Sequence, residues 1–307
     1  MENMVKSSRA RRFGVRAAVV AGTAGTVLAM AAPMVSAQDA PMQIPGATIC
    51  NEYLSSTGAP AVGCLAVDVL SGTFDNNGFN LPIKAGDMVI ASALTEDGDG
   101  NPVLLPRDDG HNGVYAKPMT VPGGVLGIDL PFNNLFGLAA VTAEVQAVEA
   151  PSFNGIVTEF DISLPVRMKI NNAFLGDNCY LGSETAPVEF RLLKTNADDD
   201  APTFEPTPDN MGVKVGGVKS AATDFAIPAA SGCGPFGVLN PIVNWRAKVP
   251  ATSGTSLTTV SNGYLFFPGQ EGNDPLDGLD GGGTGSLGSL SSSGSSGSLG
   301  SSGSSGS

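Results

Sequence analysis

Four oxygen-bearing side chains between residues 97 and 108 have a spacing that suits calcium. A calcium loop places oxygen ligands at its first, third, fifth and twelfth positions, because Ca²⁺ takes six to eight hard oxygens around a tight turn. The sequence departs from this pattern at the sixth position, where Pro102 replaces glycine, and at the twelfth, which is an aspartate. Calcium is the one cofactor that the sequence suggests, and a plain turn rich in Asp, Asn and Gly is the alternative. The candidate ligands are Asp97, Asp99, Asn101 and Asp108.

Catalysis by a nucleophile and a histidine would depend on His111, the only histidine in the chain. It stands in the polar run DDGHNG, which predicts a loop, and residues 45–268 contain no Gly-x-Ser-x-Gly motif. Hydrolysis of glycans by two carboxylates is an alternative, but one tryptophan and four tyrosines are few for a sugar-binding cleft. Glu144, Glu159 and Asp161 alternate with apolar residues, which is typical of a solvated sheet face. We therefore expect no enzymatic activity.

The four cysteines, Cys50, Cys64, Cys179 and Cys233, predict two disulfides. Three pairings are open, and sequence proximity favours Cys50–Cys64 and Cys179–Cys233. A zinc site is the rival interpretation, but the chain has no Cys-x-x-Cys pair.

Residues 1–37 have the pattern of a signal peptide. Five basic residues precede the apolar run 17–32, and Val35-Ser36-Ala37 offers a small-x-small cleavage site. The apolar run is short for a membrane span, which needs about 20 residues. We expect a protein that is secreted or associated with the cell wall.

Charge excludes one class of partner. The whole chain has a formal net charge of −13, and its acidic surface repels nucleic acid phosphates. We expect no nucleic acid partner, whereas a cell-wall component or another extracellular partner stays open.

Period-two alternation of apolar and polar residues recurs along the chain, with turn residues between the runs. This pattern predicts an all-β fold, an antiparallel β-sandwich. We divide the chain into an N-terminal β region at 38–120, which could belong to the same domain, a β-sandwich region at 121–270 and a disordered Gly/Ser-rich tail at 271–307. The expected strands are 64–70, 88–94, 125–130, 139–148, 156–164, 166–170, 188–192, 223–227 and 257–267.

One short helix is expected after Asn240-Pro241, with Asn240 as its cap and Pro241 at its first position. Trp245 follows closely. A sole tryptophan near the end of a domain often closes a core, so we expect it at the core edge, and an exposed ligand-stacking residue is the alternative.

Three stretches, 175–195, 222–234 and 239–267, carry a resemblance. A Leu-Gly-x-x-Cys-x-x-Gly-Ser run is followed by Pro and a strand, and later by Phe-x-x-Pro-x-x-x-Gly-Cys-Gly and Leu-Asn-Pro. This order resembles a group of uncharacterised, signal-peptide-bearing secreted β-rich proteins of actinomycetes. The resemblance implies a Cys179–Cys233 disulfide and an extracellular setting, and it implies no catalytic residues. The matching positions are Leu175, Gly176, Cys179, Gly182, Ser183, Pro187, Phe225, Pro228, Gly232, Cys233 and Gly234.

Together these features predict a non-enzymatic secreted or cell-envelope protein that acts as a structural, adhesive or ligand-binding module. The alternatives are a secreted carboxylate-based hydrolase and a β-barrel of the mycolic outer membrane. Many prolines, two expected disulfides and few aromatic residues argue against the membrane alternative.

Overall fold

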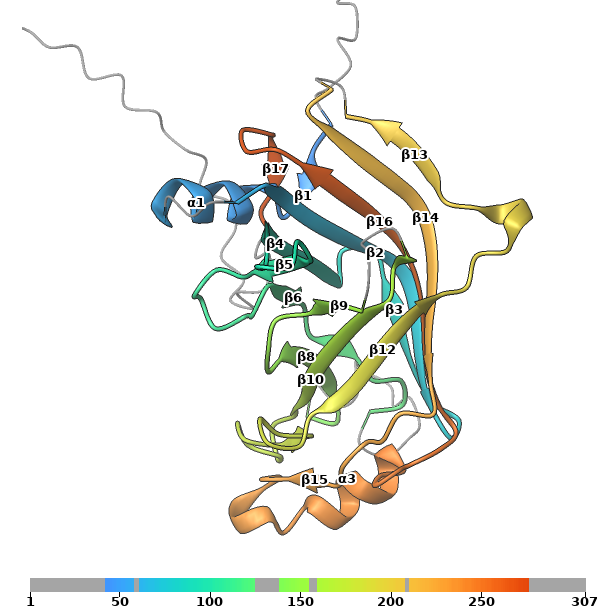
Figure 1. The fold of residues 1–307 in the computed structure, drawn as a ribbon. Coiled ribbons are helices and arrows are strands. Elements are labelled where there is room, and N and C mark those ends of the chain that lie inside the picture. Colours follow the sequence, from blue (N-terminus) through green and yellow to red (C-terminus); the bar gives the residue numbers. More distant parts are fainter. Residues whose placement is uncertain (1–41, 58–60, 125–137, 155–158, 208–209, 276–307) are drawn as a thin grey trace, which may run out of the picture. The chain divides into compact units, whose positions relative to one another are not determined.

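The computed structural model describes residues 42–57, 61–124, 138–154, 159–207 and 210–275 (Figure 1). The expected signal peptide, the strand expected at 125–130 and the Gly/Ser tail from residue 276 onward lie outside these residues. The prediction of an antiparallel β fold with two disulfides is confirmed.

Within the described residues, fifteen strands form one sheet with the path β15-β11-β10-β12-β14-β16-β2-β4-β5. The expected N-terminal and β-sandwich regions share this sheet, because β16 lies between β14 and β2. The strands that come first in the chain are β2 (Gly63–Asn76), β3 (Phe79–Lys84), β4 (Met88–Glu96), β5 (Pro102–Leu105), β6 (Val114–Ala116), β7 (Met119–Thr120), β8 (Thr142–Ala147) and β9 (Ser152–Phe153). Those that follow are β10 (Ile162–Asn171), β11 (Tyr180–Leu181), β12 (Val188–Lys194), β13 (Thr203–Pro206), β14 (Gly212–Thr223), β15 (Ala230–Ser231) and β16 (Thr255–Phe266).

Shorter elements lie at the edges of this sheet. The strands β1 (Ile44–Pro45) and β17 (Gly272–Asn273) form a separate parallel pair. The helices are α1 (Ala47–Thr57), α3 (Asn240–Ala247) and the 3-10 turns η2 (Asp198–Asp200) and η3 (Pro235–Gly237).

Most alternating runs form the expected strands, and three expectations change. Residues 156–158 of the run 156–164 lie outside the described residues, and its last part joins the run 166–170 in a single strand, β10, which begins at Ile162 just after Phe160, whose φ is 54°. The strand expected at 223–227 is wrong, because Asp224 has a φ of 54° and ends β14. The expected helix forms, but Asn240 does not cap it, since its Oδ1 accepts the Cys233 N–H at 2.9 Å.

Two irregularities bend the long central strands. On β14 the register shifts between Val215 and Val218, where Gly217 has a φ of +72°. The Gly217 N–H donates to Asn262 Oδ1 at 3.1 Å, and its carbonyl accepts from Asn196 Nδ2 at 2.9 Å. The β16–β2 pair shifts register at Ser261. Such bulges increase strand twist and bend, and β14, β16 and β2 curl around β8, β10 and β12 (Figure 1).

The two faces of the curled sheet bury different groups. The inner face holds the largest core, which is continued by side chains of β8, β10 and β12 as in a sandwich. Its centre is aromatic: the rings of Phe190 and Phe225 meet edge to face at 4.7 Å, and Phe74 lies 6.4 Å from Phe190. The outer face of β2 and β16 is covered at one end by α1, where Cys50 packs with Tyr264.

Both disulfides have the pairing that sequence proximity favours. Cys50–Cys64 fastens α1 to β2, and Cys179–Cys233 joins the loop before β11 to the loop before η3. Disulfides persist in oxidising compartments, so this pair of bonds is typical of an extracellular environment.

Candidate functional site

An apolar cavity of about 320 Å³ lies on the inner face of the curled sheet. Part of its wall, including Val69, Met88 and Ile90, belongs to the main core. Small-molecule sites are typically concave, mostly apolar and about 300–1,000 Å³ in volume. The lining residues are Leu65, Val67, Val69, Met88, Ile90, Phe153, Phe160, Ile162, Leu192, Phe204, Val213, Val215, Val218, Ser220, Thr259, Ser261, Gly263, Tyr264 and Leu265.

Strand alternation selects these residues. On β16 the odd-numbered residues from Thr259 to Leu265 line the cavity, and Tyr264 borders it as well although it belongs, like Phe266, to the cluster under α1. On β14 the bulge moves the phase by one residue, so that Val215 and Val218 both line the cavity. Because of the bulge, apolar side chains from both halves of β14 face the cavity.

Gly263 provides part of the empty space. Its strand is extended rather than left-handed, and a Cβ built on it would meet only the Cβ of Val215, at 3.9 Å. A larger side chain would fit the backbone here and would project into the cavity. The missing side chain is therefore one reason why the wall is hollow.

Four residues that carry a hydroxyl interrupt the apolar wall: Ser220, Thr259, Ser261 and Tyr264. Ser220 and Thr259 are directly opposite each other in the β14–β16 ladder, and both residues are more than nine-tenths buried. Ser261 is also buried and donates to the carbonyl of Val218 at 3.5 Å. The cavity thus combines an apolar wall with a small patch of hydrogen-bonding groups.

A carboxylate clamp holds one side of the cavity. Asp161, between the lining residues Phe160 and Ile162, accepts from Arg191 Nη2 at 2.7 Å and from Arg191 Nε at 3.1 Å. Asn154 Nδ2 donates to the same carboxylate at 3.0 Å. The hydrogen bond from Arg191 is the main reason that the pKa of Asp161 lies below its usual range. The clamp ties the residues just before β10, including Phe160, to Arg191 on β12.

Exposed apolar side chains continue the cavity wall toward solvent. Phe204 on β13 is 60% exposed, and Val213 and Leu265, which face each other across the β14–β16 ladder, are exposed as well. All three line the cavity. This apolar rim, formed by Phe204, Val213 and Leu265, is suited to a ligand whose body is also apolar.

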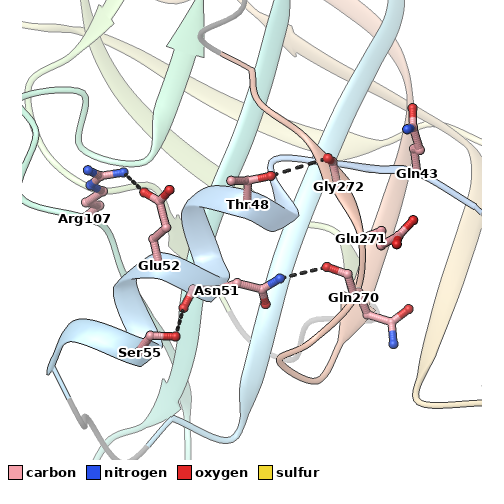
Figure 2. Close-up of a pocket in the computed structure, with 9 residues that line it drawn as sticks. All are labelled: Gln43, Thr48, Asn51, Glu52, Ser55, Arg107, Gln270, Glu271 and Gly272. Carbon is pink, nitrogen blue, oxygen red and sulfur yellow. Dashed lines mark hydrogen bonds and ion pairs between the residues drawn. The ribbon is translucent and has the colours of Figure 1, made fainter. Parts of the chain in front are cut away.

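A second concave region is a polar cleft beside α1, with a volume of about 750 Å³ (Figure 2). Its side chains bind mainly to one another and to main chain. Glu52 pairs with Arg107 at 2.5 Å, and Asn51 Nδ2 donates to the carbonyl of Gln270 at 2.7 Å. Thr48 Oγ1 donates to the carbonyl of Gly272 at 3.4 Å. The two hydrogen bonds fasten the segment around β17 to α1, and the ion pair joins α1 to the loop after β5.

Three of the four candidate calcium ligands, Asp97, Asp99 and Asn101, share the β4–β5 turn, and Asp108 lies beyond β5. Asp97 sits in the β4–β5 turn, where its carboxylate accepts the N–H groups of Asp99 and Asn101 at 2.9 and 2.8 Å and the Asn101 side chain at 3.0 Å. These bonds, led by that from the Asn101 side chain, lower the pKa of Asp97. Asp108 follows β5, whose Leu105 pairs with Ala93 at the far end of the hairpin. In the part of the chain that is described, no three acidic, His or Cys residues form a metal-binding group. Calcium binding stays a prediction.

His111 lies in a loop, and its ring is 5.0 Å from that of Tyr115. The buried Tyr115 hydroxyl donates to Asp109 Oδ2 at 2.8 Å, and Asp109 Oδ1 accepts the His111 N–H at 2.9 Å. Burial, followed by the bond to Asp109, raises the pKa of Tyr115 far above its usual range. The Asp109 carboxylate thus joins the main chain of His111 to the side chain of Tyr115 in this loop.

The expectation for Trp245 is wrong. Its side chain is 75% exposed, because α3 buries Val243 and Ala247 on its other face. Of the other carboxylates, Glu144 accepts from Gln146 Nε2 at 2.9 Å, whereas Asp161 belongs to the clamp described above.

None of the candidate site residues named from the sequence lines the cavity, although Asp161 lies between the lining residues Phe160 and Ile162. Alternation on β2 and β16 could mark one face of each strand, but the wall exists only after β14 pairs with β16. The KVGGVKS run of β14 shows no continuous alternation of apolar and polar residues, because the bulge falls on the two glycines.

The helices of the described ranges are too short or too polar to cross a lipid bilayer. Comparisons of the chain with models of protein families, with curated proteins and with solved structures found no match.

Proposed function

We propose that this protein is an extracellular, non-enzymatic binding protein that holds an apolar small molecule in the cavity on the inner face of its sheet. The observation that carries the proposal is a cavity of about 320 Å³ with an apolar wall, a gap at Gly263 and an apolar rim. Burying apolar ligand surface in such a cavity contributes about 25 cal/mol per Å².

Secretion is part of the proposal. The basic and apolar segment at residues 1–37, the two disulfides and the resemblance to secreted actinomycete proteins all support it. Release into the medium of the natural host, with a mature chain that begins near Gln38, would test this part.

The experiment for the binding function uses diphenylhexatriene, a hydrocarbon whose fluorescence rises in apolar surroundings. We expect saturable binding to the wild-type chain. Gly263→Leu should weaken it by at least about tenfold, because the leucine side chain would fill the cavity. Gly98→Leu is the matched control, since Gly98 lies in the exposed β4–β5 turn and a Cβ there would meet no atom within 4 Å.

Unchanged melting temperatures of the two variants would show that folding is intact. Equal binding by wild type and Gly263→Leu, or no binding by wild type, would contradict the proposal.

A further inference from the structure

We propose that the ligand of this cavity carries a neutral hydrogen-bonding group, a hydroxyl or carbonyl, which Ser220 and Thr259 bind, so that the ligand belongs to the class of apolar alcohols and ketones. This inference rests on the proposed binding function and names its ligand class.

The first support is the position of the two hydroxyl-bearing residues. Ser220 and Thr259 form a directly opposed pair on β14 and β16, and both line the cavity. In an antiparallel ladder, such opposed side chains lie on the same face about 5 Å apart. One ligand oxygen between them can therefore meet both hydroxyls.

The second support is that these hydroxyls have unused hydrogen-bonding capacity. Ser220 and Thr259 are 8% and 7% exposed, and no side-chain hydrogen bond of either is found among the described residues. The one fully buried side-chain polar atom without a partner in those residues is Ser92 Oγ, so the two hydroxyls are not sealed from the cavity. Their neighbour Ser261 already donates to the carbonyl of Val218. A ligand oxygen that binds both residues can therefore take the place of water at hydroxyls that are open to the cavity.

The third support is the absence of charge in the wall. None of the described residues that line the cavity is Lys, Arg, His, Asp or Glu. An ionised carboxylate or phosphate placed there would lose its hydration without meeting a counter-charge, which is strongly unfavourable. Arg191 is committed to Asp161 outside this wall. The site therefore favours a neutral polar group over an anionic one.

The apolar rim indicates the second property of the ligand, a hydrocarbon body. Phe204, Val213 and Leu265 continue the apolar surface from the cavity to solvent. A molecule whose oxygen binds at Ser220 and Thr259 would lay its hydrocarbon part along this wall. The predicted ligand thus enters with its polar group first.

The test measures displacement of diphenylhexatriene by three ligands of equal chain length: 1-decanol, decane and, at about pH 8, ionised decanoate. The wild-type chain should prefer 1-decanol to both of the others. The double variant Ser220→Ala/Thr259→Val keeps the shape of the wall and removes both hydroxyls. It should lose about tenfold in affinity for 1-decanol, while its affinity for the hydrocarbon probe stays within about twofold.

Thr258→Val is the matched control, because Thr258 precedes Thr259 on β16 and is exposed. It should bind 1-decanol as the wild type does. Two outcomes would overturn the inference while leaving the proposed function intact: a double variant that binds the probe and keeps the full preference for 1-decanol, or a wild-type chain that binds decanoate as tightly as 1-decanol. A wild-type chain that does not bind the probe contradicts the proposed function itself.

Discussion

Single positions on β14 and β16 decide what the cavity can accept. Gly263 leaves a gap in the wall, and Ser220 and Thr259 add hydrogen-bonding groups to a surface that is mostly apolar. On a core strand these positions would normally hold Val, Ile or Phe, which fill space and need no polar partner. A small residue and two hydroxyl side chains on neighbouring strands are what the proposed binding function requires of this wall.

The clamp at Asp161 makes the cavity corner sensitive to acid. The pKa of Asp161 is lowered in the folded chain, so its ionised form stabilises the fold at pH values above the unfolded pKa of about 3.9. This stabilisation is lost as the pH falls through the lower, folded pKa. Because Arg191 is largely exposed, we expect a contribution of no more than about 1 kcal/mol.

Asp161→Asn should accordingly lower the melting temperature at neutral pH by up to about 4 °C and weaken probe binding modestly. Thermal unfolding between about pH 7 and pH 2 should show the gap between wild type and variant closing below about pH 4. Glu184→Gln, which breaks the more exposed Arg167–Glu184 pair, is the control and should change less. A gap that widens on acidification would refute this role.

Secondary elements differ in how well the sequence predicts them. β8, β12 and β16 follow clean alternation, and the structure has them close to the expected bounds. β14 was not predicted, because the bulge at Gly216-Gly217 shifts the alternation of apolar and polar residues by one position in the middle of the strand. The helix α1 is built partly from Thr, Cys and Ser, which have weak helix propensity, and it is fastened by the Cys50–Cys64 bond rather than by a clear apolar stripe.

The candidate site was harder to predict than the fold. Its wall joins strands that are about 200 residues apart in the chain, such as β2 and β16, and period-two patterns do not specify which strands pair. The sequence instead drew attention to the Asp97 turn, where the same residue types that bind calcium also make ordinary turns. Local spacing could not separate these two uses.

The disulfides allow a prediction at the level of elements. The Cys179–Cys233 bond closes a span of 54 residues and the Cys50–Cys64 bond one of 14. In the chain-entropy account, removing the first with paired Cys→Ala changes should cost about 4 kcal/mol and removing the second about 3 kcal/mol. Denaturant unfolding of the two double variants measures both values. A larger loss for the Cys50–Cys64 variant would show that α1 docking, rather than chain entropy, dominates.

At the scale of the whole molecule, the charged residues lie outside the described cavity wall. The chain has a formal net charge of −13, yet the described wall of the cavity is uncharged. An acidic surface repels polyanions, and an uncharged cavity is what the proposed apolar ligand requires. This division agrees with the proposed binding function and argues against a nucleic acid or anionic lipid partner.

The parallel pairing of β1 with β17 brings residues near the two ends of the described chain side by side. The Ile44 N–H donates to the carbonyl of Glu271 at 3.2 Å, and the Gly46 N–H donates to that of Asn273 at 2.9 Å. The fold is therefore suited to circular permutation, with a short Gly/Ser linker from Asp274 to Gln43 and new termini opened in the exposed turn between Gly98 and Asp99. We expect the permuted protein to form both disulfides and to bind diphenylhexatriene within about threefold of the wild-type affinity, because the cut leaves every cavity strand whole. In such a protein a tag or surface anchor could be attached at the β4–β5 hairpin instead of beside α1.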